Sequence, residues 1–343
     1  MKITTCHSAD KFLKLDHNCN FNSRALYTPI CAVRGSYGKK LTQMLVSTSS
    51  DLTWVDFQKW EPPFRGFPIP DIAARTPAKY SDGENAEVDF YTGVTLGLLD
   101  ESGDTVLQIS NFVLGKAQRH TANTHFEDGT MGLSYADRKH LQKPHNVLQG
   151  LDKKLKKVFS MWIGNDGNGF LLFGRPMREH CYKKETMVEV KLLIHTRDDP
   201  TVSKAVVKEK KAYQVFDSFV TGIDLPVPMH EQLFEFLREN LNESMQSWNI
   251  SDPSSMTVTK EQFPFLPVFI FTYQDKQFFL EPEDYLMPNP DTDHFSIGYV
   301  ILRTSRSGYI HIGVPFFKKY FTEWHFGNKK RIHIAEKTDY CNP

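Results

Sequence analysis

Short apolar runs interrupted by turn residues recur along the whole chain, and this pattern limits what the chain can fold into. One run ends at Leu45-Val46, a polar turn occupies residues 47–50, and a second run covers residues 52–55. Such short runs, rich in aromatic and β-branched residues, are typical of strands. The composition agrees, because 26 Phe and 13 Tyr accompany 19 Pro and 20 Gly. We therefore expect a mainly β protein.

The same pattern predicts individual elements. Residues 87–91 and 94–99 predict two strands joined by a turn at Thr92-Gly93. Residues 161–163 and 170–173 predict a second hairpin, whose glycine-rich connection is a turn rather than a phosphate loop because a strand follows it.

Two helices are expected as well. The spacing of Leu233, Phe236, Leu237 and Leu241 predicts an amphipathic helix over residues 230–242. The basic stretch 152–157 favours a solvated helical face, and an anion-binding patch is the minor alternative.

The length of the chain indicates how many domains it forms, and its charge indicates which partners it is suited to bind. A chain of 343 residues corresponds to about two domains. We expect an N-terminal arm or pro-segment remnant over residues 1–25, an N-terminal lobe over 26–155 and a C-terminal lobe over 156–343. Lys and Arg together number 41, as do Asp and Glu, which favours neither nucleic acid nor an anionic membrane as a partner. We expect a monomer.

Several common catalytic and metal motifs are missing from the sequence. The five cysteines form no CxxC pair, and neither HExxH nor GxSxG occurs. His120 and His125 are five residues apart, a spacing that suits neither a helix face nor alternate strand positions, so solvated loop histidines are favoured over metal ligands. We expect no metal and no cofactor.

The first residues lack the apolar run of a secretory signal, which leaves the compartment open.

The two halves carry similar pieces in a similar order. Each has an apolar run that enters a hydroxyl-containing turn, at 44–50 and 214–219, and later a glycine between apolar residues, at Gly132 and Gly313. The chain resembles the pepsin-like aspartic peptidase family over roughly residues 27–336. Six segments resemble family motifs in the family's order: 49–55, 126–133, 159–163 with 170–174, 266–271, 280–285 and 312–321.

The resemblance implies a bilobal fold of two β-barrel-like lobes with a cleft between them. Each lobe of that family gives one aspartate to a dyad that shares a proton, because two like charges so close cannot both ionise. The ionised carboxylate is the general base for a water molecule, and the protonated one polarises the peptide carbonyl.

This sequence departs from the family at the positions of both aspartates. In the first loop, Ser47 stands where the family has aspartate, and a hydroxyl does not titrate near working pH. We interpret this loop as one residue short, which puts the placement of Thr48 and its bonding across the lobe junction in doubt. In the second loop, Asp217-Ser218 matches the family, but Phe219 replaces its glycine. Asp217 is thus the predicted remnant of the dyad, the alternative being a loop aspartate that accepts local N–H bonds.

The resemblance also implies a flap residue and a ligand. Tyr91-Thr92-Gly93 is similar to the flap motif of the family, so Tyr91 is a candidate flap tyrosine, the alternative being a cross-strand aromatic. We assign Tyr91, Thr48 and Ser218 to substrate binding.

The expected function is non-catalytic binding of an extended peptide or protein segment between the lobes. An active aspartic endopeptidase is the alternative, and a decayed product with little function is a third possibility. The family resemblance implies a secreted or lysosomal location.

Overall fold

The computed structural model describes 22 stretches of the chain, and every statement below concerns these residues. They are residues 12–15, 32–37, 40–56, 67–68, 76–79, 85–99, 105–120, 129–134, 145–151, 157–163, 169–174, 176–191, 202–207, 210–218, 220, 222–249, 256–288, 293–297, 304–305, 308–327, 329–339 and 341.

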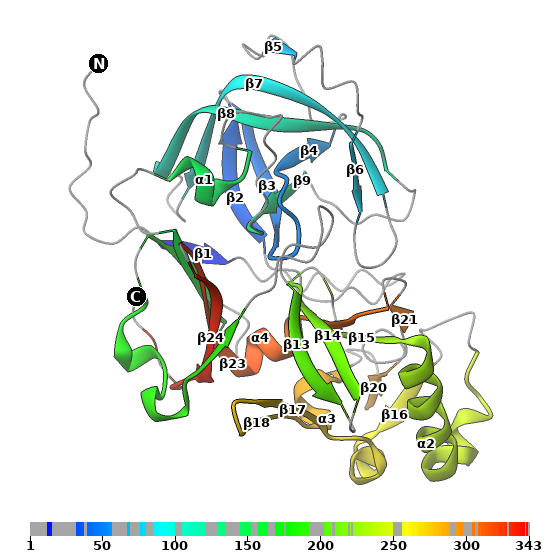
Figure 1. Ribbon diagram of the computed structural model, residues 1–343. Coiled ribbons are helices and arrows are strands. Elements are labelled where there is room, and N and C mark those ends of the chain that lie inside the picture. Colours follow the sequence, from blue (N-terminus) through cyan, green and yellow to red (C-terminus); the bar gives the residue numbers. More distant parts are fainter. Residues whose placement is uncertain are drawn as a thin grey trace.

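The N-terminal half forms one large sheet, in the upper part of Figure 1. Its path is β2-β3-β9-β4-β8-β7-β5, with β6 on β7, and a further pairing of β2 with β7 links the sheet back onto itself. The strands are β2 (Ala32–Tyr37), β3 (Lys40–Ser47), β4 (Trp54–Asp56), β5 (Phe67–Pro68), β6 (Thr76–Lys79), β7 (Asn85–Leu99), β8 (Thr105–His120) and β9 (Gly129–Gly132). Helix α1 (Val147–Gly150) follows.

The C-terminal half carries three smaller sheets, in the lower part of Figure 1. The five-stranded sheet, in the order β13-β14-β22-β15-β21, consists of β13 (Val202–Val207), β14 (Lys210–Phe216), β15 (Ile223–Pro226), β21 (Thr304–Ser305) and β22 (Ile310–Ile312). The other two comprise β16 (Thr257–Thr259), β20 (His294–Ser296) and β19 (Met287–Pro288), and the hairpin β17 (Phe269–Tyr273) with β18 (Lys276–Leu280).

Helices in this half are short, with one exception. They are α2 (Val227–Met245), α3 (Pro282–Tyr285) and α4 (Val314–Lys319), with the 3-10 helices η3 (Glu179–Cys181), η4 (Lys184–Thr186) and η6 (Lys260–Phe265). Helix α2 confirms the helix expected over 230–242, and it buries Leu233, Leu237 and Leu241. Within the described part of the chain, no helix is both long and apolar enough to cross a membrane.

A six-stranded sheet combines strands from both ends of the chain. Its order is β1-β11-β10-β23-β24-β12, from β1 (Phe12–Leu15), β10 (Val158–Ile163), β11 (Gly169–Phe173), β12 (Val188–Lys191), β23 (Tyr320–Phe326) and β24 (Lys330–Glu336). The N-terminal arm therefore contributes an edge strand, β1, to this sheet.

The core explains why these segments are strands. Alternate residues of β23 and β24, such as Trp324, Ile332 and Ile334, are fully buried in a core that spans both halves. A smaller apolar cluster on the other face of the six-stranded sheet includes Phe321 and Ala335. Because both faces are covered, most residues of β23 are buried, including the polar Thr322 and Glu323.

The structure tests several of the sequence predictions. Strands β10 and β11 pair as the expected hairpin, and the connection itself lies outside the described residues. The turn expected at Thr92-Gly93 was wrong, since β7 continues through it to Leu99 and pairs with β8 along its whole length. An irregularity between Tyr91 and Val94, with Gly93 at φ 81°, absorbs these residues within the strand. Most of the basic stretch 152–157 lies outside the described residues.

One disulfide, Cys181–Cys341, ties the C-terminal segment to η3. Replacing both cysteines with alanine is expected to lower the free energy of unfolding by about 2–5 kcal/mol, because the cross-link restricts an unfolded chain over a long loop. Urea denaturation with and without reductant measures the effect. Reductant should shift the midpoint of the wild type and leave that of the double variant unchanged; a wild-type midpoint insensitive to complete reduction would contradict the expectation.

Candidate functional site at the lobe junction

The two halves use the same local arrangement around the predicted site. Strand β9 lies between β3 and β4, parallel to β3 and antiparallel to β4. Strand β22 lies between β14 and β15, again parallel to the first and antiparallel to the second. Ser47 is the last residue of β3, and Asp217 directly follows β14. The two predicted site residues therefore occupy equivalent places.

Two glycines, the last residue of β9 and the residue after β22, allow this arrangement. A Cβ on Gly132 would lie 2.5 Å from the carbonyl oxygen of Leu52, and one on Gly313 would lie 2.0 Å from that of Val220. The main chain of the loop after Ser47 thus passes directly against Gly132, and that of the loop after Asp217 passes directly against Gly313. These are the two glycines that the sequence singled out as corresponding positions.

Thr48 and Ser218 join the halves through four reciprocal hydrogen bonds. The Thr48 hydroxyl donates to the Phe216 carbonyl at 2.7 Å and accepts from the Ser218 N–H at 3.0 Å. The Ser218 hydroxyl donates to the Val46 carbonyl at 2.6 Å and accepts from the Thr48 N–H at 3.1 Å. We call this set of bonds the interlobe clamp. It holds together the residues that directly follow Ser47 and Asp217.

The interlobe clamp bears on two interpretations of the sequence. Thr48 follows β3 directly and is bonded across the junction, so the first loop is not one residue short, and Ser49 occupies the next position, which the family fills with glycine. Thr48 and Ser218 are both fully buried, with their hydroxyls engaged by main chain. Their side chains therefore bond main chain across the lobe junction, and their assignment to substrate binding stays a prediction.

The side chain of Ser47 is hydrogen-bonded within its own turn. Its hydroxyl accepts the Ser50 N–H at 3.0 Å and lies 3.2 Å from the Ser49 hydroxyl, and the side chain is fully buried. The backbone N–H of Leu133 donates to its carbonyl at 2.8 Å. A hydroxyl in these contacts stabilises the loop and supplies no titratable proton.

Asp217 is buried beside a histidine that the sequence analysis missed. Its backbone N–H donates to the Ile312 carbonyl at 2.9 Å, and its side chain is 1% exposed. Nδ1 of His311 lies 3.9 Å from Asp217 Oδ2, within ion-pair range when the imidazole is protonated. The signal was available in the sequence, since His311 is a polar residue between Ile310 and Ile312 in an otherwise apolar strand. Phe219 lies outside the described residues.

Tyr91 lies within β7, opposite Leu114 of β8 and Pro68 of β5. It packs partly buried against the main core. Burial, and then the nearby charge of Asp89, raises the pKa of its phenol. Tyr91 thus lies where the alternative interpretation, a cross-strand aromatic residue, would place it. Its role as a flap tyrosine stays a prediction.

Comparison with known proteins agrees with this architecture. The sequence profile of the family described as eukaryotic aspartyl protease matches residues 41–337, which include both halves and the interlobe clamp. A search of curated proteins gave no significant match. Because the match covers most of the chain, and because the bilobal mainly β fold accompanies it, this chain belongs to the pepsin-like eukaryotic aspartyl protease family.

Proposed function

We propose that this protein is a non-catalytic member of its family, and that it binds an extended peptide or protein segment between its lobes. The observation that carries the proposal is Ser47, because it occupies the place equivalent to Asp217 and offers a hydroxyl already used by its own turn. Proton sharing between two carboxyl groups needs a second acid at this place. The buried imidazole of His311 lies beside Asp217 and supplies no carboxyl group.

Peptide binding is favoured over decay because the interlobe clamp is complete. Each of its two hydroxyls satisfies a buried donor and a buried acceptor of the other lobe. Losing either hydroxyl would leave buried polar groups without partners, which is costly. An extended peptide would be held by main-chain hydrogen bonds, with side-chain pockets giving specificity.

The Cys181–Cys341 disulfide supports an oxidising compartment, such as a secreted or endomembrane location.

The wild-type protein is expected to cleave no member of a peptide library between about pH 3 and 6, the range in which a proton-sharing dyad works. Asp217→Asn should leave this background unchanged, because no dyad is there to lose. The measurement is mass spectrometry of the library after long incubation. Turnover that a dyad-directed inhibitor blocks and Asp217→Asn abolishes would establish the alternative, an active endopeptidase.

Binding is measured separately, by fluorescence polarisation of labelled library peptides with folded protein. We expect saturable binding that is retained in Asp217→Asn. A folded protein that neither cleaves nor binds any member would favour the decayed-product interpretation.

Repair variants separate the departures from the family in the first loop from the one in the second. Ser47→Asp alone is expected to leave cleavage at background, because Phe219 still follows Ser218 where the family has glycine, and small misplacements are costly in catalysis. The smallest change expected to give measurable cleavage restores Asp-Thr-Gly in the first loop, as Ser47→Asp with Ser49→Gly, and adds Phe219→Gly in the second. Robust cleavage by the single variant, measured on one substrate at acidic pH, would show that Phe219 does not obstruct the site.

A further inference from the structure

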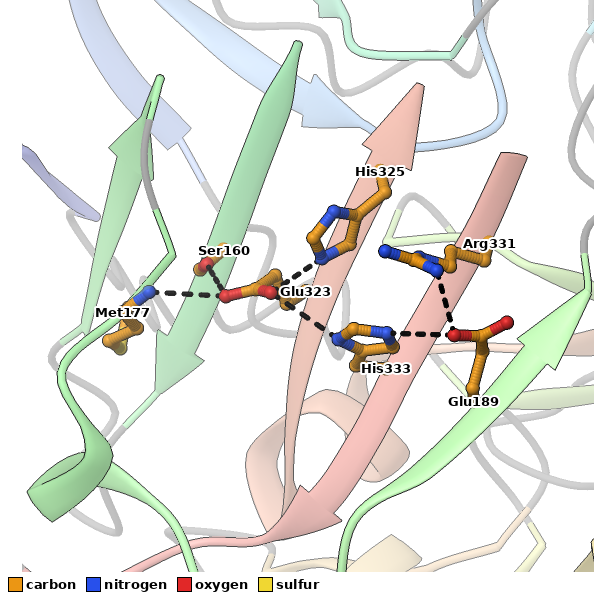
Figure 2. Close-up of polar contacts among 7 residues, drawn as sticks. All are labelled: Ser160, Met177, Glu189, Glu323, His325, Arg331 and His333. Atoms are coloured by element: carbon orange, nitrogen blue, oxygen red, sulfur yellow. Dashed lines mark hydrogen bonds and ion pairs between the residues drawn. The ribbon is translucent and has the colours of Figure 1, made fainter. Parts of the chain in front are cut away.

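A second group of titratable side chains lies on the six-stranded sheet, on different elements from the interlobe clamp. Glu323 and His325 are two residues apart on β23, and His333 on β24 is the cross-strand partner of Glu323. Residues at these positions project from the same face of a sheet. Figure 2 shows the three side chains converging between the two strands.

The spacing of the three ligand atoms suits a metal ion. Glu323 Oε1 lies 2.6 Å from His325 Nε2 and 3.4 Å from His333 Nδ1. One oxygen or nitrogen from each residue lies within 4.8 Å of the others. Tetrahedral zinc with bonds of ~2.0 Å needs ligand atoms about 3.3 Å apart, so small side-chain adjustments would suffice.

Surrounding contacts orient these ligands. The other oxygen of Glu323, Oε2, accepts from the Ser160 hydroxyl at 3.0 Å and from the Met177 N–H at 3.1 Å, which leaves Oε1 directed at the histidines (Figure 2). On its far side, His333 Nε2 lies 3.5 Å from Glu189 Oε2. A carboxylate behind a ligating imidazole fixes its tautomer and raises its basicity, a recurrent feature of zinc sites.

Charge and exposure fit the same interpretation. Arg331 donates to Glu189 Oε2 at 2.9 Å and balances the charge of that outer carboxylate. The Glu323 side chain is 5% exposed, whereas those of His325 and His333 are 15% and 17% exposed. An ion could therefore enter from the histidine side, and water could complete its coordination.

We propose that Glu323, His325 and His333 form a binding site for a divalent transition-metal ion of the zinc type. Two imidazoles and one carboxylate are a known ligand set for zinc with three protein ligands and an open fourth position. Because the ligands come from neighbouring strands, the ion would join β23 to β24. The site does not depend on the proposed function, since it shares no residue with the lobe junction.

The test uses full-length protein freed of metal with a chelator and titrated with Co²⁺, whose visible absorption reports coordination. We expect one Co²⁺ per chain, displaced by Zn²⁺, and a Zn²⁺-dependent rise in the unfolding temperature, since an ion that binds only the folded state stabilises it. His325→Gln should abolish the cobalt band. The matched control is His294→Gln, an exposed histidine on β20 that should bind as the wild type does.

Glu189→Gln tests the outer contact and should weaken binding ~10–100-fold, the usual cost of losing such a partner. His325 is more exposed than Glu323, so its variant is expected to fold, and circular dichroism checks this. Wild-type protein that shows no cobalt band at millimolar Co²⁺ would overturn the proposal. So would a folded His325→Gln variant that binds Co²⁺ as tightly as the wild type.

Discussion

Gly313→Ala is expected to prevent stable folding of the C-terminal half. The added methyl group would lie 2.0 Å from the carbonyl oxygen of Val220 and 2.4 Å from that of Gly222, and both atoms are backbone. These segments cannot separate easily, because the N–H groups of Gly313 and Val314 donate to the same two carbonyls. We expect a loss of at least ~3 kcal/mol, the upper end of ordinary overpacking and a large part of total stability.

Gly132→Ala is the corresponding change in the first lobe, where the methyl group would lie 2.5 Å from the Leu52 carbonyl oxygen. Gly327→Ala is the control, since nothing lies within 4 Å of the position of its added Cβ. Soluble yield and urea denaturation compare the three variants. A Gly313→Ala protein as stable as Gly327→Ala would show that the loop after Asp217 is not packed against β22 as described.

Thr48→Ala is expected to lower the free energy of unfolding by about 2–6 kcal/mol, because two buried backbone groups lose the Thr48 hydroxyl as a partner, at ~1–3 kcal/mol each. These groups are the Phe216 carbonyl and the Ser218 N–H. Thr48→Ser keeps the hydroxyl and should cost much less. Urea denaturation gives both values, and equal losses in the two variants would mean that the methyl group of Thr48 matters rather than its hydroxyl.

A double-mutant cycle with Ser218→Ala tests whether the interlobe clamp acts as a unit. Residues in one hydrogen-bond network couple by roughly 0.5–3 kcal/mol. We therefore expect Thr48→Ala and Ser218→Ala together to cost less than the sum of the two single changes. Strict additivity would indicate that each hydroxyl acts independently of the other.

The sequence predicted the fold through local signals that act over a few residues. The apolar run before Ser47, the segment 49–55 and the run around Gly313 each keep the pattern that their strands need, because both sides of those strands are buried. The helix over 230–242 followed from its apolar spacing alone. The prediction of a turn at Thr92-Gly93 was wrong because it used only local signals. A glycine at positive φ serves a bulge within a strand as well as a hairpin turn, and only pairing with β8 distinguishes them.

The chemical identity of the site was readable from residue types, whereas its geometry was not. The residue types alone led to the prediction that Ser47 replaces an acid and that Asp217 is the remnant of the dyad. The prediction misjudged the length of the first loop, because the position of Thr48 is fixed by contacts with residues about 170 positions away. The same distance in sequence hid the pairing of His311 with Asp217, although both residues stood in recognised segments.

By itself, the sequence determined the class of fold and the family, since these depend on residue type and local period. Only the tertiary structure decided that Thr48 and Ser218 are bound to each other, and that Glu323, His325 and His333 share one face of a sheet. The physical reason is strand register. A one-residue shift between β23 and β24 would send these side chains to opposite faces, and register is set by packing across the whole sheet rather than by any short segment.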